Sequence, residues 1–156
     1  QGGLMKVGLY SERARRIVTH ARQVIAENQL SADDEHIRIF RQAVLGGLVS
    51  GNFDPIKQSP DFYNLSGCRD LLFHVQEHLF SPLALQACID NVGLTFLGFV
   101  NLPFDVKQAF DKHFASDPRR INLENWDSLE EAAPDIFGNM FQFYCQRQSN
   151  NISRLG

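Results

Sequence analysis

Three short segments with strand character, separated by long helical stretches, are the strongest constraint on the fold of this sequence. Residues 4–10 and 140–146 alternate between two faces, and the apolar run 94–100 follows a helix stop at Gly93. Strands that are separated by helices along the chain are typical of an α/β domain built on one sheet. We therefore expect a strand, four helices, a second strand, two helices and a last strand.

Helical periodicity and capping residues divide the remaining stretches. The predicted helices begin after Ser11, near Ser31, at about residue 66 with an end near 79, at Ser81-Pro82, after Pro103 and at Asn122. Residues 50–61 consist almost throughout of turn-forming residues and are predicted to form a mobile loop. Four arginines in the first helical stretch, Arg13, Arg15, Arg16 and Arg22, are interpreted as a solvated face.

Length and composition favour one domain. A chain of 156 residues that is 44% hydrophobic can bury a core without cross-links. We expect residues 11–80 to form a helical insertion or lid and residues 148–156 to form a flexible tail. The opening Gln1-Gly2-Gly3 resembles the middle of a turn that leads into a strand, which suggests a fragment of a larger domain.

Charge and cysteine content narrow the possible partners and the compartment. A net charge of −3 gives no electrostatic reason to expect a nucleic acid or an anionic membrane as partner. Cys68, Cys88 and Cys145 are sparse and odd in number, as expected for buried thiols in a reducing cytoplasm. The sequence contains neither an apolar run long enough to span a bilayer nor a signal-peptide pattern, so we expect a cytoplasmic protein.

Several local sequences resemble class I S-adenosylmethionine-dependent methyltransferases. Residues 2–10, Gly-Gly-Leu-Met-Lys-Val-Gly-Leu-Tyr, are similar to the turn and fifth strand of that class, with Gln1 in place of the usual proline. Residues 68–78, Cys-Arg-Asp-Leu-Leu-Phe-His-Val-Gln-Glu-His, and 94–99 resemble a bacterial subgroup that is often fused to tetratricopeptide repeats. Residues 140–144 resemble the final strand of that subgroup. The likeness covers nearly the whole chain.

The resemblance implies an unusual strand order. In this class the last three strands are ordered five, seven, six, and strand seven is antiparallel. Residues 140–146 are therefore expected to lie between 4–10 and 94–100, as a central strand covered on both sides. The parent enzyme would transfer a methyl group from S-adenosylmethionine to an unknown acceptor.

The cofactor site of that class needs a glycine-rich turn after the first strand and an acidic residue at the end of the second. The only comparable pattern, Gly46-Gly47 with Gly51, follows a helix. We therefore expect no cofactor binding by this chain and no activity of the chain alone.

One predicted helix carries a cluster of titratable side chains that are candidates for catalysis. Asp70, His74 and His78 follow one another at helical spacing, with Glu77 beside them. In a methyltransferase, His74, Glu77 and His78 could orient the acceptor or remove its proton. Arg69 and Asp70 are candidates for substrate binding, and so is Tyr10 at the end of the first strand. The alternative is that these groups bridge neighbouring helices.

Residues 74–78 also read His-x-x-Glu-His, the inverted zinc-protease motif. On a helix, the two histidines could bind zinc and Glu77 could act as general base. A third ligand would have to come from elsewhere, and the downstream residues Glu124, Glu130 and Glu131 look like a solvated helix face. Zinc hydrolysis is a secondary hypothesis, and no metal site is predicted.

Two further expectations concern an alternative function and the assembly of the chain. A non-enzymatic helical module for regulation or interaction is the main alternative to a methyltransferase portion. If the sheet ends at residues 4–10, the bare strand edge should recruit another chain, and a homodimer through this strand is predicted.

Overall fold

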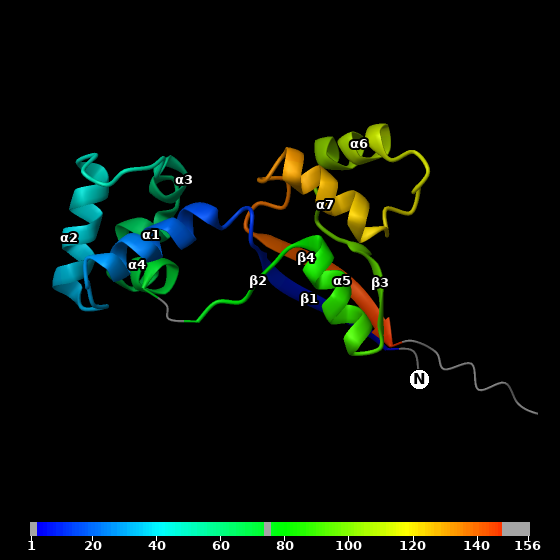
Figure 1. Cartoon of the computed structure of the whole chain (residues 1–156), viewed down its shortest axis with the longest axis horizontal. Coiled ribbons are helices and arrows are strands. Elements are labelled where there is room, and N and C mark those ends of the chain that lie inside the picture. Colours follow the sequence, from blue (N-terminus) through cyan, green and yellow to red (C-terminus); the bar gives the residue numbers. More distant parts are fainter. Residues whose placement is uncertain (1–2, 74–75, 148–156) are drawn as a thin grey trace, which may run out of the picture. The chain divides into compact units, whose positions relative to one another are not determined.

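The computed structural model describes residues 3–73 and 76–147, and these residues belong to two compact units. The first, called the sheet unit, is formed by Gln1–Ala14 with His78–Gly156, and the second, the helical unit, is Arg15–Glu77. The described residues contain seven α-helices and four strands (Figure 1). The predicted α/β class is confirmed. The helical unit falls within the segment 11–80 that was predicted to be an insertion.

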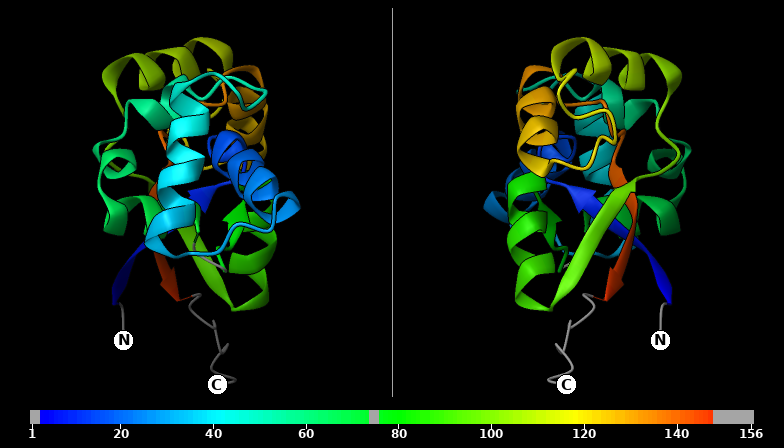
Figure 2. Two further views of the ribbon diagram at one scale, coloured as in Figure 1. Left: turned by 90° about the vertical axis from the view of Figure 1, so that its left-hand side faces the viewer. Right: turned by 90° about the vertical axis from the view of Figure 1, so that its right-hand side faces the viewer.

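The sheet confirms the predicted position of the last strand. Its strands are β1 (Leu4–Ser11), β2 (Leu79–Phe80), β3 (Leu94–Phe99) and β4 (Met140–Arg147), in the order β2-β1-β4-β3. β4 is antiparallel to both β1 and β3 (Figure 2, right). The two-residue strand β2 is parallel to β1 and was not predicted, because two residues carry no periodicity.

One face of the sheet carries the core of this unit. Phe141, Phe143 and Cys145 of β4 are buried on that face. They pack in one cluster with residues of α5 (Pro82–Asn91), α6 (Phe104–His113) and α7 (Leu123–Ala132). Trp126 of α7 is fully buried in this cluster and stacks on Phe110 with ring centroids 4.1 Å apart. Aromatic packing therefore holds the helices to the sheet.

The opposite face of β4 is open, and the prediction that this strand is covered on both sides was wrong. Met140 is 36% exposed and Tyr144 is 39% exposed, and Gln142 and Gln146 alternate with them. Because successive residues of a strand point to opposite faces, this polar alternation is typical of a sheet with one solvated face.

Capping residues correctly predicted the starts of two helices in the sheet unit. Ser81 accepts a hydrogen bond from the backbone N–H of Ala84 at 3.1 Å, and Pro82 begins α5. Asn122 accepts one from the N–H of Glu124 at 2.8 Å, and α7 follows directly. Each side chain satisfies a backbone donor that the first helical turn leaves without a partner.

The helical unit has its own apolar core. Its elements are α1 (Arg16–Glu27), α2 (Asp34–Leu45), α3 (Asp54–Lys57), the 3-10 helix η1 (Pro60–Tyr63) and α4 (Leu65–Leu72). Buried residues from all of them form a single cluster, which includes Ala21, Ile37, Phe40, Ile56, Phe62, Cys68 and Leu72. This unit therefore buries its own hydrophobic residues.

Three sequence expectations for the helical segment were wrong. Ser11 does not cap the first helix, because β1 runs to Ser11 and α1 begins only at Arg16. The predicted mobile loop contains α3 and η1, which Ile56 and Phe62 anchor in the core. The helix expected to reach residue 79 ends at Leu72. In the loop, tertiary burial overrode local propensity.

The outer edge of β1 is only partly covered in the described residues. β2 pairs with Tyr10 and Ser11, and no pairing extends to the rest of the strand on that side. Leu4 is 65% exposed and Met5 is 47% exposed near the open end. Among the described helices, none has both the length and the apolar character that crossing a bilayer requires.

The two faces of β4 can be compared by mutation. We predict that Phe143→Ala lowers the free energy of unfolding of the sheet unit by about 3–5 kcal/mol, because it leaves a cavity in the aromatic core. Its neighbour Tyr144 points to the open face, so Tyr144→Ala should cost roughly 1 kcal/mol or less. Urea titration followed by the fluorescence of Trp126, the single tryptophan, measures both. Equal losses would contradict the assignment of faces.

Candidate functional site at the carboxyl end of the sheet

Three of the four strands end at the same edge of the sheet. β1 and β3 are both antiparallel to β4, and β2 is parallel to β1, so the carboxyl ends of β1, β2 and β3 lie where β4 begins. In open α/β sheets, ligands bind in the crevice beyond the carboxyl ends of the strands. In the sheet unit this edge carries a buried charged cluster and a pocket.

The charged cluster joins the end of β1 to α7. Ser11 Oγ donates a hydrogen bond to Glu130 Oε1, and Arg13 Nη1 donates to Glu130 Oε2 at 2.9 Å. Arg13 also donates to both carboxylate oxygens of Asp127, at 2.9 and 3.0 Å. Such a bidentate contact is directional as well as strong. The cluster therefore fixes the chain beyond β1 against α7.

Burial controls the ionisation of this cluster. Glu130 is fully buried, and desolvation raises its pKa above the ordinary value, although hydrogen bonds from Ser11 and Arg13 act in the opposite direction. The pKa of Arg13 is raised as well, chiefly by its hydrogen bond to Asp127. The guanidinium therefore stays charged, while burial favours the protonated form of Glu130.

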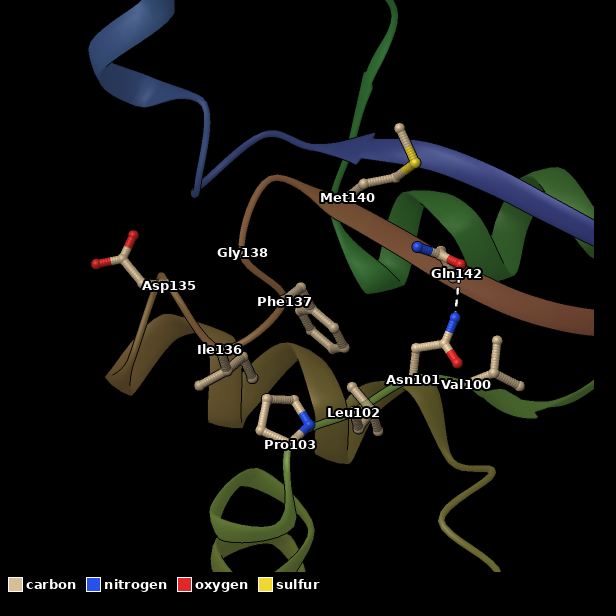
Figure 3. Close-up of a pocket in the computed structure, with 10 residues that line it drawn as sticks. All are labelled: Val100, Asn101, Leu102, Pro103, Asp135, Ile136, Phe137, Gly138, Met140 and Gln142. Atoms are coloured by element: carbon tan, nitrogen blue, oxygen red, sulfur yellow. Dashed lines mark hydrogen bonds between the residues drawn. The ribbon is translucent and has the colours of Figure 1, made fainter. Parts of the chain in front are cut away.

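A pocket of about 320 Å³ lies beside the end of β3 (Figure 3). It is formed by the connection from β3 to α6 and the connection from α7 to β4. Its lining residues are Val100, Asn101, Leu102, Pro103, Asp135, Ile136, Phe137, Gly138, Met140 and Gln142. The volume is at the lower end of the range for small-molecule sites, about 300–1,000 Å³.

The polar groups of the pocket lie at its two ends. Asn101 Nδ2 donates a hydrogen bond to Gln142 Oε1 at 2.9 Å at one end, whereas the exposed Asp135 carboxylate at the other end points away from the remaining lining residues (Figure 3). Asn101 has a φ of 58°, a left-handed conformation that asparagine tolerates better than most residues. The apolar side chains of Leu102, Pro103 and Ile136 lie between the two ends (Figure 3). Such a pocket suits a small molecule with an apolar body and a polar group.

The predicted substrate-binding residues lie in different places. Tyr10 is at the carboxyl end of β1, opposite Met140 of the pocket wall, although it does not line the pocket itself. Arg69 belongs to the helical unit, where it donates to the Ala32 carbonyl oxygen at 2.8 Å and to Asp34 Oδ1 at 2.7 Å. Asp70 is exposed on α4. Their roles in substrate binding stay predictions.

The predicted catalytic stripe does not lie on one helix. Because α4 ends at Leu72, Glu77 and His78 follow outside any helix, and His74 lies outside the described residues. Glu77 accepts hydrogen bonds from Arg15 and, at 2.8 Å, from Arg22, and its side chain is only 8% exposed. It therefore forms ion pairs with two arginines of the helical unit. The exposed His78 belongs to the sheet unit, and catalytic roles for His74 and His78 stay predictions.

The zinc hypothesis loses its geometric basis. The His-x-x-Glu-His motif places both histidines on one helix face, whereas Glu77 and His78 are not helical. Within residues 3–73 and 76–147, no group of three or more histidine, cysteine, aspartate or glutamate side chains is placed to hold a metal ion.

Sequence reasoning missed the charged cluster because two patterns were interpreted as solvated faces. Arg13, Arg15 and Arg22 are largely buried in ion pairs, so the solvated face predicted for them was wrong. Glu130 was also assigned to an exposed helix face. It follows Trp126 by four residues, a spacing that places it on the buried side of α7. This spacing from Trp126 was the signal in the sequence that could have indicated that Glu130 is buried.

Comparison with known proteins adds no assignment. No protein-family model matches this sequence, and no curated protein matches it either.

The raised pKa of Glu130 predicts a pH dependence of stability. A group whose pKa is higher in the folded state contributes most below its ordinary value, here 4.5, and that contribution is lost as the pH rises through the folded-state pKa. Wild type should therefore lose stability relative to Glu130→Gln as the pH rises from the ordinary value of 4.5 through the higher folded-state pKa. Urea titrations of both proteins measure the difference, with the exposed Glu131→Gln as control for loss of charge on the same helix. A relative gain for wild type would contradict the account.

Glu77 is predicted to be structural. Glu77→Ala leaves the guanidinium groups of Arg15 and Arg22 without their carboxylate, which should destabilise the helical unit by about 3–5 kcal/mol. Hydrogen exchange of the α1 and α4 amides should accelerate accordingly. The exposed neighbour Gln76 gives a matched control, because Gln76→Ala removes none of these ion pairs. Unchanged exchange in Glu77→Ala would show that the ion pairs do not hold the unit together.

Proposed function

We propose that this chain is the C-terminal, substrate-side portion of a class I S-adenosylmethionine-dependent methyltransferase, and that it is inactive without the cofactor-binding half. The observation that carries the proposal is the strand order β1-β4-β3, in which the last strand of the chain lies antiparallel between the other two. A simple succession of right-handed crossovers would add each new strand parallel at an edge, so this arrangement is a specific feature.

The connections between strands agree with the proposal. β1 and β3 are parallel, and α5 precedes β3 and packs with it on the covered face, as a crossover helix does. The helical unit is inserted between β1 and β2. In the resembled class this region commonly forms the substrate pocket and its lid, and the position of the helical unit in the chain supports that role.

The residues of this chain do not fit the cofactor itself. The connection from β1 to α1 contains no glycine, and its Arg13 and Arg15 side chains are occupied by ion pairs. β2 is separated from α5 by Ser81 alone, and the turn after β3 holds Asn101 and Pro103 instead of glycines. The Gly46-Gly47 pair ends a helix. We therefore assign no step of methyl transfer to these residues.

The proposed contribution of this chain is to hold the methyl acceptor. The pocket beside β3 combines several apolar side chains with the Asn101–Gln142 pair, and it lies at the edge where open α/β sheets bind ligands. Positioning and exclusion of water are the contributions that such a pocket can make. The buried cluster of Ser11, Arg13 and Glu130 would keep the adjoining end of β1 fixed.

The sequence encoded upstream of Gln1 and cofactor binding together test this proposal. We expect the gene to encode a strand followed by a glycine-rich turn before residue 1. Protein that includes this segment should bind S-adenosylmethionine at one equivalent in calorimetry, and the 156-residue chain should bind none. An upstream sequence without that turn, or a longer protein that does not bind, would favour a non-enzymatic regulatory or interaction module.

We also propose that the open edge of β1 pairs with a second copy when the 156-residue chain is alone. Unpaired strand edges recruit other strands through their free backbone groups. β2 pairs with only two residues of β1, and Leu4 and Met5 near the other end are exposed. In the longer enzyme, a further strand of the same sheet would occupy this edge instead.

Charged side chains introduced at the open edge of β1 should weaken the proposed dimer. In sedimentation velocity, wild type is expected to dimerise, and Leu4→Lys with Met5→Lys should weaken dimerisation at least about tenfold, because charged side chains disfavour edge pairing. Leu83→Lys introduces the same charge at an exposed leucine of α5 and should have no effect. A wild-type monomer at all concentrations, or equal weakening by Leu83→Lys, would contradict the proposed interface.

A further inference from the structure

The helical unit contains a groove of about 440 Å³ that the proposed function does not use. It lies between α1, α2 and the segment that follows α2. Its walls are mainly apolar, with Val24, Leu30, Ile39, Ala43, Leu48 and Val49 among the lining residues. All of them belong to the helical unit, so the groove is complete within one compact body.

The end of α2 explains why this space is hollow. The N–H of Leu48 donates to the carbonyl oxygen of Ala43 at 2.9 Å, and that of Gly47 donates to Val44 at 3.2 Å, with Gly47 at φ 69°. These bonds define a Schellman motif, in which an apolar residue at the position of Leu48 usually packs on the helix residue that accepts its N–H. Here that residue is Ala43, whose side chain is too small to cover Leu48. Leu48 consequently stays 82% exposed at the lip of the groove.

The wall beyond Leu48 is fixed in place. His20 Nε2 is 2.8 Å from the carbonyl oxygen of Ser50, and the His20 ring packs on Phe53 with centroids 5.6 Å apart. Gly51 has a φ of 121° and passes close to the same ring, because a Cβ at this position would lie 3.1 Å from His20 Nε2. A groove whose walls are held in this way needs little reorganisation to bind a ligand.

Two polar side chains of the groove already have partners within the helical unit. Glu27 accepts a hydrogen bond from Gln23 at 2.8 Å, and Asn28 donates to the Val24 carbonyl oxygen at 2.8 Å. Burial of apolar surface is therefore the main source of affinity for a ligand here. The lining contains a carboxylate and no lysine or arginine, which disfavours anionic ligands.

We infer that this groove binds a small, uncharged apolar molecule, of the size of a bicyclic aromatic or a medium alkyl chain. Its volume lies within the range of small-molecule sites, about 300–1,000 Å³. A protein partner would need about 800 Å² of surface on each side, whereas the exposed large apolar side chains of the rim are Ile39 and Leu48. The inference uses only residues of the helical unit, so it does not depend on the acceptor pocket proposed beside β3.

Binding of N-phenyl-1-naphthylamine, a neutral aromatic dye, to the full chain tests the inference. Wild type should bind one equivalent saturably, with increased dye fluorescence. Leu48→Ser removes the apolar lip and should weaken binding about tenfold. Ala43→Phe fills the groove and should abolish binding. Leu45→Ser is the matched control, because Leu45 is exposed on the same helix end without lining the groove, and its affinity should stay within about twofold of wild type.

Methyl NMR locates the dye independently of the variants. Resonances of Ile39 and Val49 should shift on titration, whereas those of Val100 and Ile136 in the sheet unit should not. If Ala43→Phe fails to fold, Leu48→Ser and the NMR shifts still decide. The absence of saturable binding, equal weakening by Leu45→Ser and Leu48→Ser, or shifts confined to the sheet unit would each overturn the inference.

Discussion

The antiparallel ladder between β1 and β4 is the interaction on which the sheet unit depends. Seven residue pairs, from Leu4 with Gln146 to Tyr10 with Met140, join the beginning of the described chain to its end. β4 also pairs with β3, so one strand holds both of its neighbours. Its inward residues Phe141, Phe143 and Cys145 carry the core on which α5, α6 and α7 pack. Without β4, neither the sheet nor its aromatic core could form.

Buried ion pairs also hold distant parts of the chain together within each unit. Arg13 bridges the segment after β1 to Asp127 and Glu130 of α7. In the helical unit, Glu77 joins Arg15 and Arg22, and Arg15 and Glu77 are the first and last residues of that unit. A carboxylate left alone in such a place would be costly, because desolvation penalises an unpaired charge. These ion pairs are better explained as structural contacts than as catalytic groups. The candidate binding sites are the pocket beside β3 and the groove of the helical unit.

The sequence predicted the parts of the fold that depend on local signals. Ser81 with Pro82 and Asn122 marked two helix starts because capping is a contact over a few residues. The order of the strands followed from a resemblance, since periodicity alone carries no information on which strands are neighbours. α3 and η1 were missed because Ile56 and Phe62 stabilise them through the core against a sequence rich in turn formers.

Long-range charge pairing was the least predictable feature of the candidate site. Arg13 and Glu130 are 117 positions apart, and only the fold brings them together. Glu130 nevertheless stood at a helical spacing from Trp126 that indicates a shared buried face. The pocket beside β3 was missed for a related reason, because its walls come from two connections that are distant in sequence.

Nuclear Overhauser contacts of Tyr144 test the central arrangement most directly. Tyr144 lies opposite Lys6 of β1 on one side and opposite Gly98 of β3 on the other. The account predicts backbone cross-peaks from Tyr144 to both residues in a spectrum of the isotope-labelled chain. Cross-peaks to only one of them would place β4 at the rim of the sheet, and the family proposal would have to be abandoned.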